Sequence, residues 1–160
     1  MFQKFTKTKY PPEHKPVLVW DGECGFCAFW VQRWKKKTQG RIDFVTYQEI
    51  ASHFQDIPLK EFKKASRLIE PDGSVFSGPD SAYRSYSYSA HPLPWHRWYT
   101  NFRWFTWLSD HGYNVIAKNR PFFFRVTRIL FGNNPEKLRP YWLLYLLVLF
   151  LGVLLLGKQL

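Results

Sequence analysis

The chain has few cysteines, and it lacks the sequence signatures of several common enzyme classes. Two cysteines in 160 residues exclude a framework of structural disulfides. No Walker loop, Rossmann fingerprint, H-E-x-x-H or G-x-S-x-G sequence occurs, so nucleotide-binding, zinc-peptidase and serine-hydrolase functions have no supporting motif. Residues 1–16 contain no apolar run of the length that a secretory signal needs, and we therefore expect no export by that route.

Acidic side chains are scarce relative to basic ones. The chain has 12 Asp and Glu against 23 Lys and Arg, which gives a formal net charge of +11. This excess predicts an anionic partner, either nucleic acid or the surface of an anionic membrane. Aromatic residues make up 20% of the chain and gather in its later part. Because the C-terminal segment described below is strongly apolar, we expect a membrane partner and no nucleic acid.

The two cysteines lie three residues apart, directly after a short apolar run. Val17–Trp20 is typical of a buried strand, and Cys27, Trp30, Val31 and Trp34 recur behind it at helical spacing. The pair therefore falls at a strand-to-helix junction, where positions i and i+3 share one face and two sulfurs can meet. Free backbone N–H groups and the positive end of the helix dipole favour the thiolate of Cys24. This predicts Cys24 as the attacking thiol and Cys27 as the resolving thiol.

Two acidic neighbours oppose ionisation of the thiols, and the cysteine pair has two other possible explanations. Asp21 and Glu23 are expected to raise the thiol pKa, which would make the pair a moderate reductant. The cysteines could instead form half of a zinc site, completed by histidines or by a second chain, or they could be buried and inert. Because the five histidines show no matching ligand spacing, we expect neither a metal nor a cofactor; they are His14, His53, His91, His96 and His111.

The residues 21–27 resemble the signature of the DCC family of thiol-disulfide oxidoreductases, D-x-x-C-x-x-C. Later matches to the family are Pro71-Asp72-Gly73, Gly78-Pro79-Asp80-Ser81-Ala82 and Ala117-Lys118-Asn119-Arg120, and the resemblance covers about residues 16–132. It implies a thioredoxin-like fold and thiol–disulfide exchange, with Asp21, Gly22 and Gly25 supporting the two cysteines. Thioredoxin-fold enzymes usually carry a cis-proline before the strand that faces the cysteines. The corresponding stretch here, residues 65–69, has no proline.

The pattern of strands and helices predicts an α/β, thioredoxin-like order of β-α-β-α-β-β-α. Expected strands are 17–20, 42–46, 66–70 and 74–76, with a hairpin at Pro71-Asp72-Gly73. An irregular helical segment covers residues 48–64, and a further helix starts near Pro79. We expect a flexible basic arm at 1–15, the thioredoxin-like core at 16–90, an aromatic basic helical extension at 91–137 and a C-terminal anchor at 138–160.

The extension at 91–137 mixes aromatic and basic side chains on amphipathic helices. One explanation is that the aromatic residues pack over the core. The other is that they form a surface lying against anionic lipid headgroups, with arginines reaching the phosphates. The sequence leaves both open.

The run Tyr141–Gly157 contains no charged side chain. It predicts one transmembrane helix, although about 25 Å of helix is at the short end of what a bilayer requires. Five cations precede the run, at Arg120, Arg125, Arg128, Lys137 and Arg139, and only Lys158 follows it. By the positive-inside rule, the protein would be a single-pass membrane protein with its N-terminal domain in the cytoplasm.

The sequence thus predicts a membrane-tethered thiol-disulfide oxidoreductase that acts on an unidentified disulfide or dithiol. The alternative hypothesis is a membrane-associated interaction or scaffold module with non-catalytic cysteines.

Overall fold

A four-stranded mixed sheet forms the centre of the protein, in a computed structural model that describes residues 1–157. The strands are β1 (Val17–Trp20), β2 (Asp43–Thr46), β3 (Arg67–Ile69) and β4 (Val75–Ser77), in the order β2-β1-β3-β4. β1 runs parallel to β2 and antiparallel to β3, which pairs antiparallel with β4. The predicted hairpin is confirmed, and Gly73 occupies it with a φ of 83° that favours glycine.

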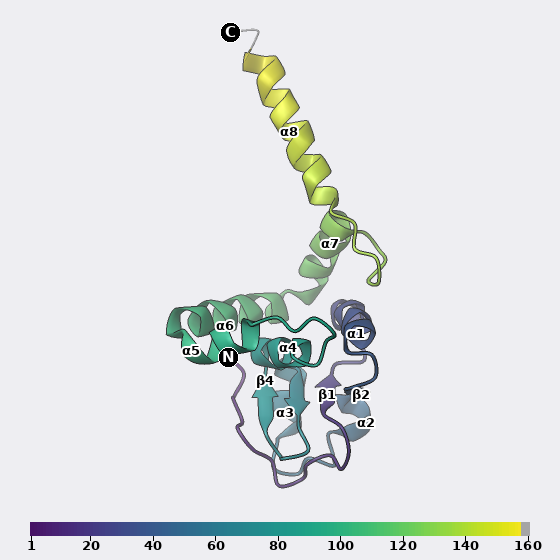
Figure 1. The fold of residues 1–160 in the computed structure, drawn as a ribbon, viewed down its shortest axis with the longest axis vertical. Helices are drawn as coiled ribbons and strands as arrows, with labels where there is room; N and C mark the ends of the chain where they lie inside the picture. The colour runs from purple at the N-terminus through teal and green to yellow at the C-terminus, as the bar shows by residue number, and fades with distance from the viewer. Residues whose placement is uncertain (158–160) are drawn as a thin grey trace.

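Eight helices accompany the sheet over the described residues (Figure 1). They are α1 (Gly25–Thr38), α2 (Tyr47–Ile50), α3 (Leu59–Lys64), α4 (Pro79–Tyr86), α5 (Trp95–Asn101), α6 (Arg103–Lys118), α7 (Arg120–Phe131) and α8 (Tyr141–Gly157). The predicted element order is confirmed from β1 to α4, with α2 and α3 as the two pieces of the irregular segment. Pro58 precedes the first residue of α3, which explains the break.

The sheet has an apolar core on each face because successive side chains of a strand point to opposite faces. Val17 and Val19 of β1 belong to a cluster with Phe54 and Phe62, on the side of α2 and α3. Leu18, with no exposed surface, belongs to a second cluster that includes residues of α1. Helices therefore cover both faces, which is how α/β proteins bury a parallel strand pair.

The N-terminal residues lie along the protein rather than away from it. The side chain of Phe2 is buried, and the backbone N–H of Thr8 donates to the carbonyl of Gly73 at 2.9 Å. The backbone N–H of Gln3 donates to Glu61 at 2.7 Å. These contacts attach the N-terminal segment, expected to be a flexible arm, to the folded core. The predicted domain boundaries stay a prediction.

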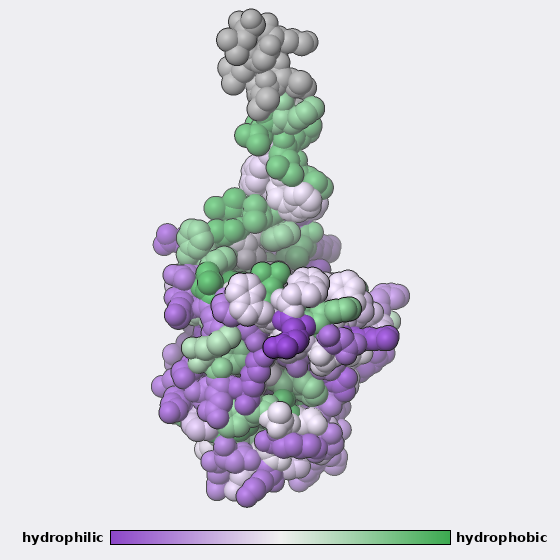
Figure 2. Space-filling view, turned by 90° about the vertical axis from the view of Figure 1, so that its left-hand side faces the viewer, coloured by the Kyte–Doolittle hydropathy of each residue, from purple (hydrophilic) through white to green (hydrophobic). Residues whose placement is uncertain are grey.

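The helical extension both covers the core and exposes aromatic surface. Phe124 of α7 contacts Phe29 of α1 with ring centroids 6.1 Å apart, so part of the extension packs as the first explanation expects. Trp104 and Trp107 of α6 are nevertheless 66% and 62% exposed. Figure 2 shows that hydrophilic residues predominate at the end of the protein farthest from α8.

Helix α8 projects away from the rest of the molecule (Figure 1). It contains 17 residues, equal to roughly 25 Å of helix. Over residues 1–157, no helix is long and apolar enough to cross a membrane. The predicted transmembrane helix is therefore not found in the described part of the chain, and residues 158–160 of the predicted anchor lie outside it.

Candidate active site

Cys24 and Cys27 meet at the start of α1, as the sequence predicts. Cys24 is the N-cap residue, and its sulfur accepts a hydrogen bond from the backbone N–H of Cys27 at 3.2 Å. The Cys27 thiol donates to the same sulfur, with the two Sγ atoms 2.7 Å apart. Both side chains are partly exposed. The pair is therefore reduced, mutually hydrogen-bonded and open to a reactant.

The two thiols differ strongly in acidity. The hydrogen bond from the Cys27 thiol lowers the pKa of Cys24 to about 6, assisted by the Cys27 backbone N–H and the Arg120 guanidinium against partial burial. The same hydrogen bond, burial and the charge of Cys24 raise the pKa of Cys27. At neutral pH, Cys24 is consequently the thiolate and Cys27 its proton donor, a division of roles typical of paired redox cysteines.

Arg120, which is 99 positions after Asp21 in the sequence, places a positive charge beside the cysteines. Its Nη1 donates to a carboxylate oxygen of Asp21 at 2.7 Å, and its Nη2 donates to the carbonyl of Lys63 at 3.0 Å. Asp21 therefore pairs with a cation beside the thiols. The pKa of Cys24 falls, as expected for the attacking thiol, and the opposing effect expected of Asp21 and Glu23 on that thiol stays a prediction. The Asp21 charge raises the pKa of Cys27.

The two motif glycines allow close packing around the cysteine loop. A Cβ on Gly22 would lie 2.7 Å from Cγ2 of Thr46, so no larger side chain fits between β1 and β2 there. The backbone N–H of Gly22 donates to Oε1 of Gln48, whose side-chain amide also donates to Asp21. A Cβ on Gly25 would lie 3.2 Å from the ring of Phe124. These contacts fix the loop around Asp21, Gly22 and Gly25, whose support of the cysteine pair stays a prediction.

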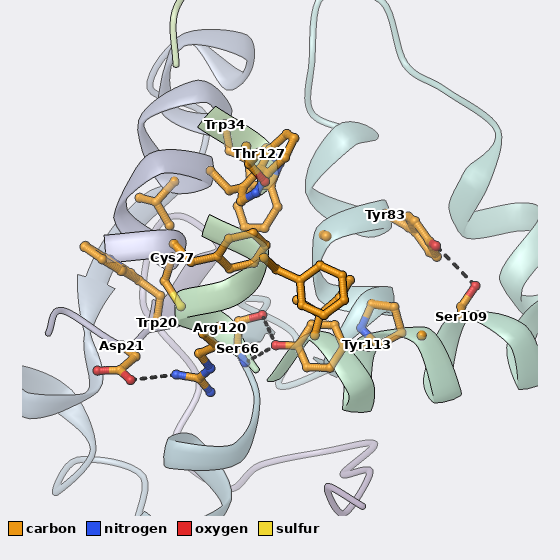
Figure 3. Close-up of a pocket in the computed structure, with 18 of the residues that line it drawn as sticks. Trp20, Asp21, Cys27, Trp34, Ser66, Tyr83, Ser109, Tyr113, Arg120 and Thr127 are labelled. Carbon is orange, nitrogen blue, oxygen red and sulfur yellow. Dashed lines mark hydrogen bonds and ion pairs between the residues drawn. The ribbon is translucent and has the colours of Figure 1, made fainter. Parts of the chain in front are cut away.

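A cavity of about 450 Å³ opens beside Cys27, between α1, α4, α6 and α7 (Figure 3). Most of its lining is apolar or aromatic, including Trp20, Trp30, Trp34 and Phe123. Arg120 also lines it, whereas Cys24 does not. Cys27 therefore borders an open apolar cavity, and Cys24 does not line it.

Ser66, directly before β3, lies in the stretch that the family resemblance matches to the cis-proline region of thioredoxins. Ser66 lines the cavity, and its backbone N–H donates to the hydroxyl of Tyr113 at 3.0 Å. Over residues 1–157, the structure contains no cis peptide bond. Residues 65–69 contain no proline, and Ser66 and Tyr113 form this part of the cavity wall.

Tyr113 and Arg120 are residues of this site that the sequence does not predict to lie beside the cysteines. The family resemblance drew attention to Asn119-Arg120, and that pair was the available signal for Arg120. No signal pointed to Tyr113. Among the described residues, no group of three or more His, Cys, Asp and Glu could hold a metal ion, so the zinc alternative gains no ligand set from them.

Comparison with known protein families gives one match. Residues 18–126 match the family described as DCC1-like thiol-disulfide oxidoreductase. The matched region covers more than half of the 160 residues and includes Cys24, Cys27 and Arg120. Searches of curated proteins and of solved structures each found no significant match.

Proposed function

The chain belongs to the DCC1-like thiol-disulfide oxidoreductase family, and we propose that it exchanges disulfides through Cys24 as attacking thiolate and Cys27 as resolving thiol. The observation that carries this assignment is the Cys24 sulfur, which accepts hydrogen bonds from both the N–H and the thiol of Cys27. Such bonds stabilise a thiolate where it is needed for attack. The order of elements from β1 to α4 supports a thioredoxin-like fold for this reaction.

The first step forms a mixed disulfide. The Cys24 thiolate attacks one sulfur of a substrate disulfide, whose S–S bond breaks, and the other substrate sulfur leaves with the electron pair. The negative charge on Cys24 disappears in this step. Because that charge helps to raise the pKa of Cys27, its loss makes Cys27 easier to deprotonate.

The second step releases the product. Cys27 loses its proton and attacks the Cys24 sulfur, the mixed disulfide breaks, and the second substrate sulfur leaves as a thiolate that takes up a proton. The substrate gains two electrons and the protein pair is oxidised to a disulfide. In the reverse direction, the same steps oxidise a dithiol.

Exchange by the reduced protein should persist at low pH. At pH 6 about half of Cys24 is thiolate, whereas a free thiol with a pKa of about 8.5 is under about 1% thiolate. The lower basicity of Cys24 reduces its nucleophilicity, which offsets part of this advantage, so we expect a rate roughly ten times that of glutathione. The measurement is the rate of reaction with dithionitrobenzoate, followed by stopped flow in buffers between about pH 4 and about pH 9.

An apparent pKa near that of a free thiol, with no rate advantage over glutathione at pH 6, would contradict the assignment. It would leave the scaffold hypothesis, in which the cysteines are not catalytic. The Cys24→Ser variant is the control, because it retains Cys27 and shows how much of the signal comes from that thiol.

The proposal includes association with an anionic lipid bilayer. It is supported by the exposed apolar side chains of α8 in residues 142–150, by exposed Trp104 and Trp107, and by the net charge of +11. Apolar area and tryptophan favour the interfacial region, and each Lys or Arg near an anionic surface contributes about 1 kcal/mol. A cytoplasmic location of the N-terminal domain belongs to the same proposal.

Leu147→Glu should weaken vesicle binding roughly fivefold or more, because it places a charge on the apolar surface of α8. Leu147 is 54% exposed, and Leu59 of α3, at 50%, provides a matched control away from the proposed surface. The measurement is flotation of the full chain with vesicles of phosphatidylcholine and phosphatidylserine. Equal binding by Leu147→Glu and Leu59→Glu, or no binding by the parent protein, would refute the membrane association.

A further inference from the structure

The apolar cavity beside Cys27 has the size and lining of a small-molecule site. Its volume of about 450 Å³ lies within the range of roughly 300–1,000 Å³ typical of ligand pockets. Aromatic side chains from three directions contribute to its walls, among them Trp30 of α1, Tyr83 of α4 and Phe123 of α7. Flat aromatic walls suit a planar, apolar ligand, which can stack on them.

Some of the polar groups that line the cavity belong to the redox pair or to residues that contact it. Cys27, Arg120 and Tyr113 all line it, and Figure 3 shows Arg120 and Tyr113 on the same side of the cavity as Cys27. The described hydrogen bonds to Asp21 and Lys63 occupy two of the five N–H groups of Arg120. Burial raises the pKa of Tyr113, so its hydroxyl stays protonated at neutral pH. Arg120 can therefore donate to an oxygen atom of a ligand, whereas the Tyr113 hydroxyl already pairs with Ser66, whose Oγ lies 3.2 Å from it.

The cavity opens toward the exposed aromatic surface. Leu108 of α6 lines the cavity and is 55% exposed, which places it at the rim. Trp104 and Trp107 lie on the same helix and are also exposed. An apolar compound dissolved in a membrane would reach this rim without passing through water.

We propose that this cavity binds a quinone, which exchanges two electrons with the Cys24–Cys27 pair. The inference rests on the exchange function proposed above and names the partner that reoxidises or reduces the pair. A planar ring with carbonyl oxygens matches the aromatic walls and the donor Arg120. A quinone is also an apolar compound that takes up two electrons and two protons, as oxidation of a dithiol requires.

The oxidation balances with the groups present. The Cys24 thiolate and the Cys27 thiol form one S–S bond, the S–H bond of Cys27 breaks, and the pair loses two electrons. The quinone becomes a hydroquinone by taking those electrons, one proton from Cys27 and one proton from solvent. Cys24 lies outside the cavity, so the same pair can exchange with a thiol substrate there and with the quinone at Cys27.

The test uses duroquinone, a tetramethyl quinone whose ring positions are all substituted, which limits addition by unspecific thiols. The full-length reduced protein is mixed with duroquinone without oxygen, and free thiols and hydroquinone are counted. We expect two thiols lost for each hydroquinone formed. In the Cys24→Ser/Cys27→Ser protein, which cannot react, duroquinone should still quench the fluorescence of the cavity tryptophans.

Gly112 provides a way to fill the cavity without straining the backbone. It lies on α6 in line with Leu108 and Ile116, which also border the cavity, and a Cβ built on it meets no atom within 4 Å. Gly112→Phe should reduce the ratio of quinone oxidation to dithionitrobenzoate exchange at least fivefold. Gly112→Ala removes the same glycine but adds little volume, so that ratio should stay near the parent value.

The outcomes separate this inference from the proposed function. Loss of exchange with dithionitrobenzoate in the parent protein would remove the proposed function itself. Normal exchange without quenching by duroquinone, quenching without thiol oxidation, or equal ratios for Gly112→Phe and Gly112→Ala would each overturn the quinone site alone. Displacement of duroquinone by decanoate with no oxidation would show an acyl-chain pocket and also overturn it.

Discussion

Replacing Cys24 with serine should reduce thiol–disulfide exchange by roughly a thousandfold or more, because a serine hydroxyl does not ionise near neutral pH and cannot attack a disulfide. The remaining thiol, Cys27, has a raised pKa and faces the cavity, so it should not replace Cys24. The measurement is single-turnover reaction with dithionitrobenzoate and with a peptide disulfide at neutral pH.

Replacing Cys27 with serine should have a different result. Attack by Cys24 remains possible, but no thiol is left to resolve the mixed disulfide, which should accumulate. Serine retains a hydroxyl that can donate to the Cys24 sulfur, so the thiolate keeps part of its stabilisation. Mass spectrometry of the trapped adduct should place the substrate on Cys24.

These two variants are a matched pair, since each removes one sulfur from the same turn. A Cys24→Ser protein that retains exchange within tenfold of the parent, or an adduct found on Cys27, would reverse the assigned roles. Thermal unfolding of both variants verifies that the loss reflects chemistry rather than folding.

The local parts of the site could be predicted from the sequence because they depend on residues near one another. Val17–Trp20 forms β1 as expected, and Cys24 lies at the start of α1 because the strand ends and the helical spacing begins there. The hairpin at Pro71-Asp72-Gly73 is equally local. Alternation, helical period and turn residues act over a few positions, and a single sequence displays them.

The electrostatics of the site could not be predicted because they depend on contacts between distant segments. Arg120 and Asp21 are 99 positions apart, and they meet because α7 packs against α1 near Gly25. Without that packing, Asp21 looked like a negative charge that would raise the thiol pKa. The 17 apolar residues of α8 are visible in the sequence and predict a membrane span, but the described helix is not long and apolar enough to cross a membrane.

Reversing the charge at position 120 should move Cys24 back toward ordinary thiol acidity. Arg120→Glu removes the cation that lowers the pKa of Cys24 and places a second carboxylate beside Asp21. The hydrogen bonds from Cys27, which lower the pKa of Cys24 most, remain in this variant, so this pKa should rise only part of the way to that of a free thiol. The thiolate fraction at pH 6 should then fall by roughly tenfold. The higher nucleophilicity of a more basic thiolate offsets part of this loss, so exchange at pH 6 should slow by about threefold. Ultraviolet titration of the thiolate and the pH profile of exchange measure both quantities.

The direction of the pH dependence distinguishes an electrostatic role of Arg120 from a structural one. Above pH 9, roughly, Cys24 is ionised in both proteins, so the difference in rate should disappear or reverse if only the pKa has changed. Arg120→Gln, which removes the charge without reversing it, should shift the profile less in the same direction. Arg125→Glu makes the same charge change at an exposed position of α7 and should leave the profile close to that of the parent. A rate for Arg120→Glu that is lower by one constant factor at every pH would contradict the electrostatic role, because a change in thiolate fraction cannot act equally on both sides of the pKa.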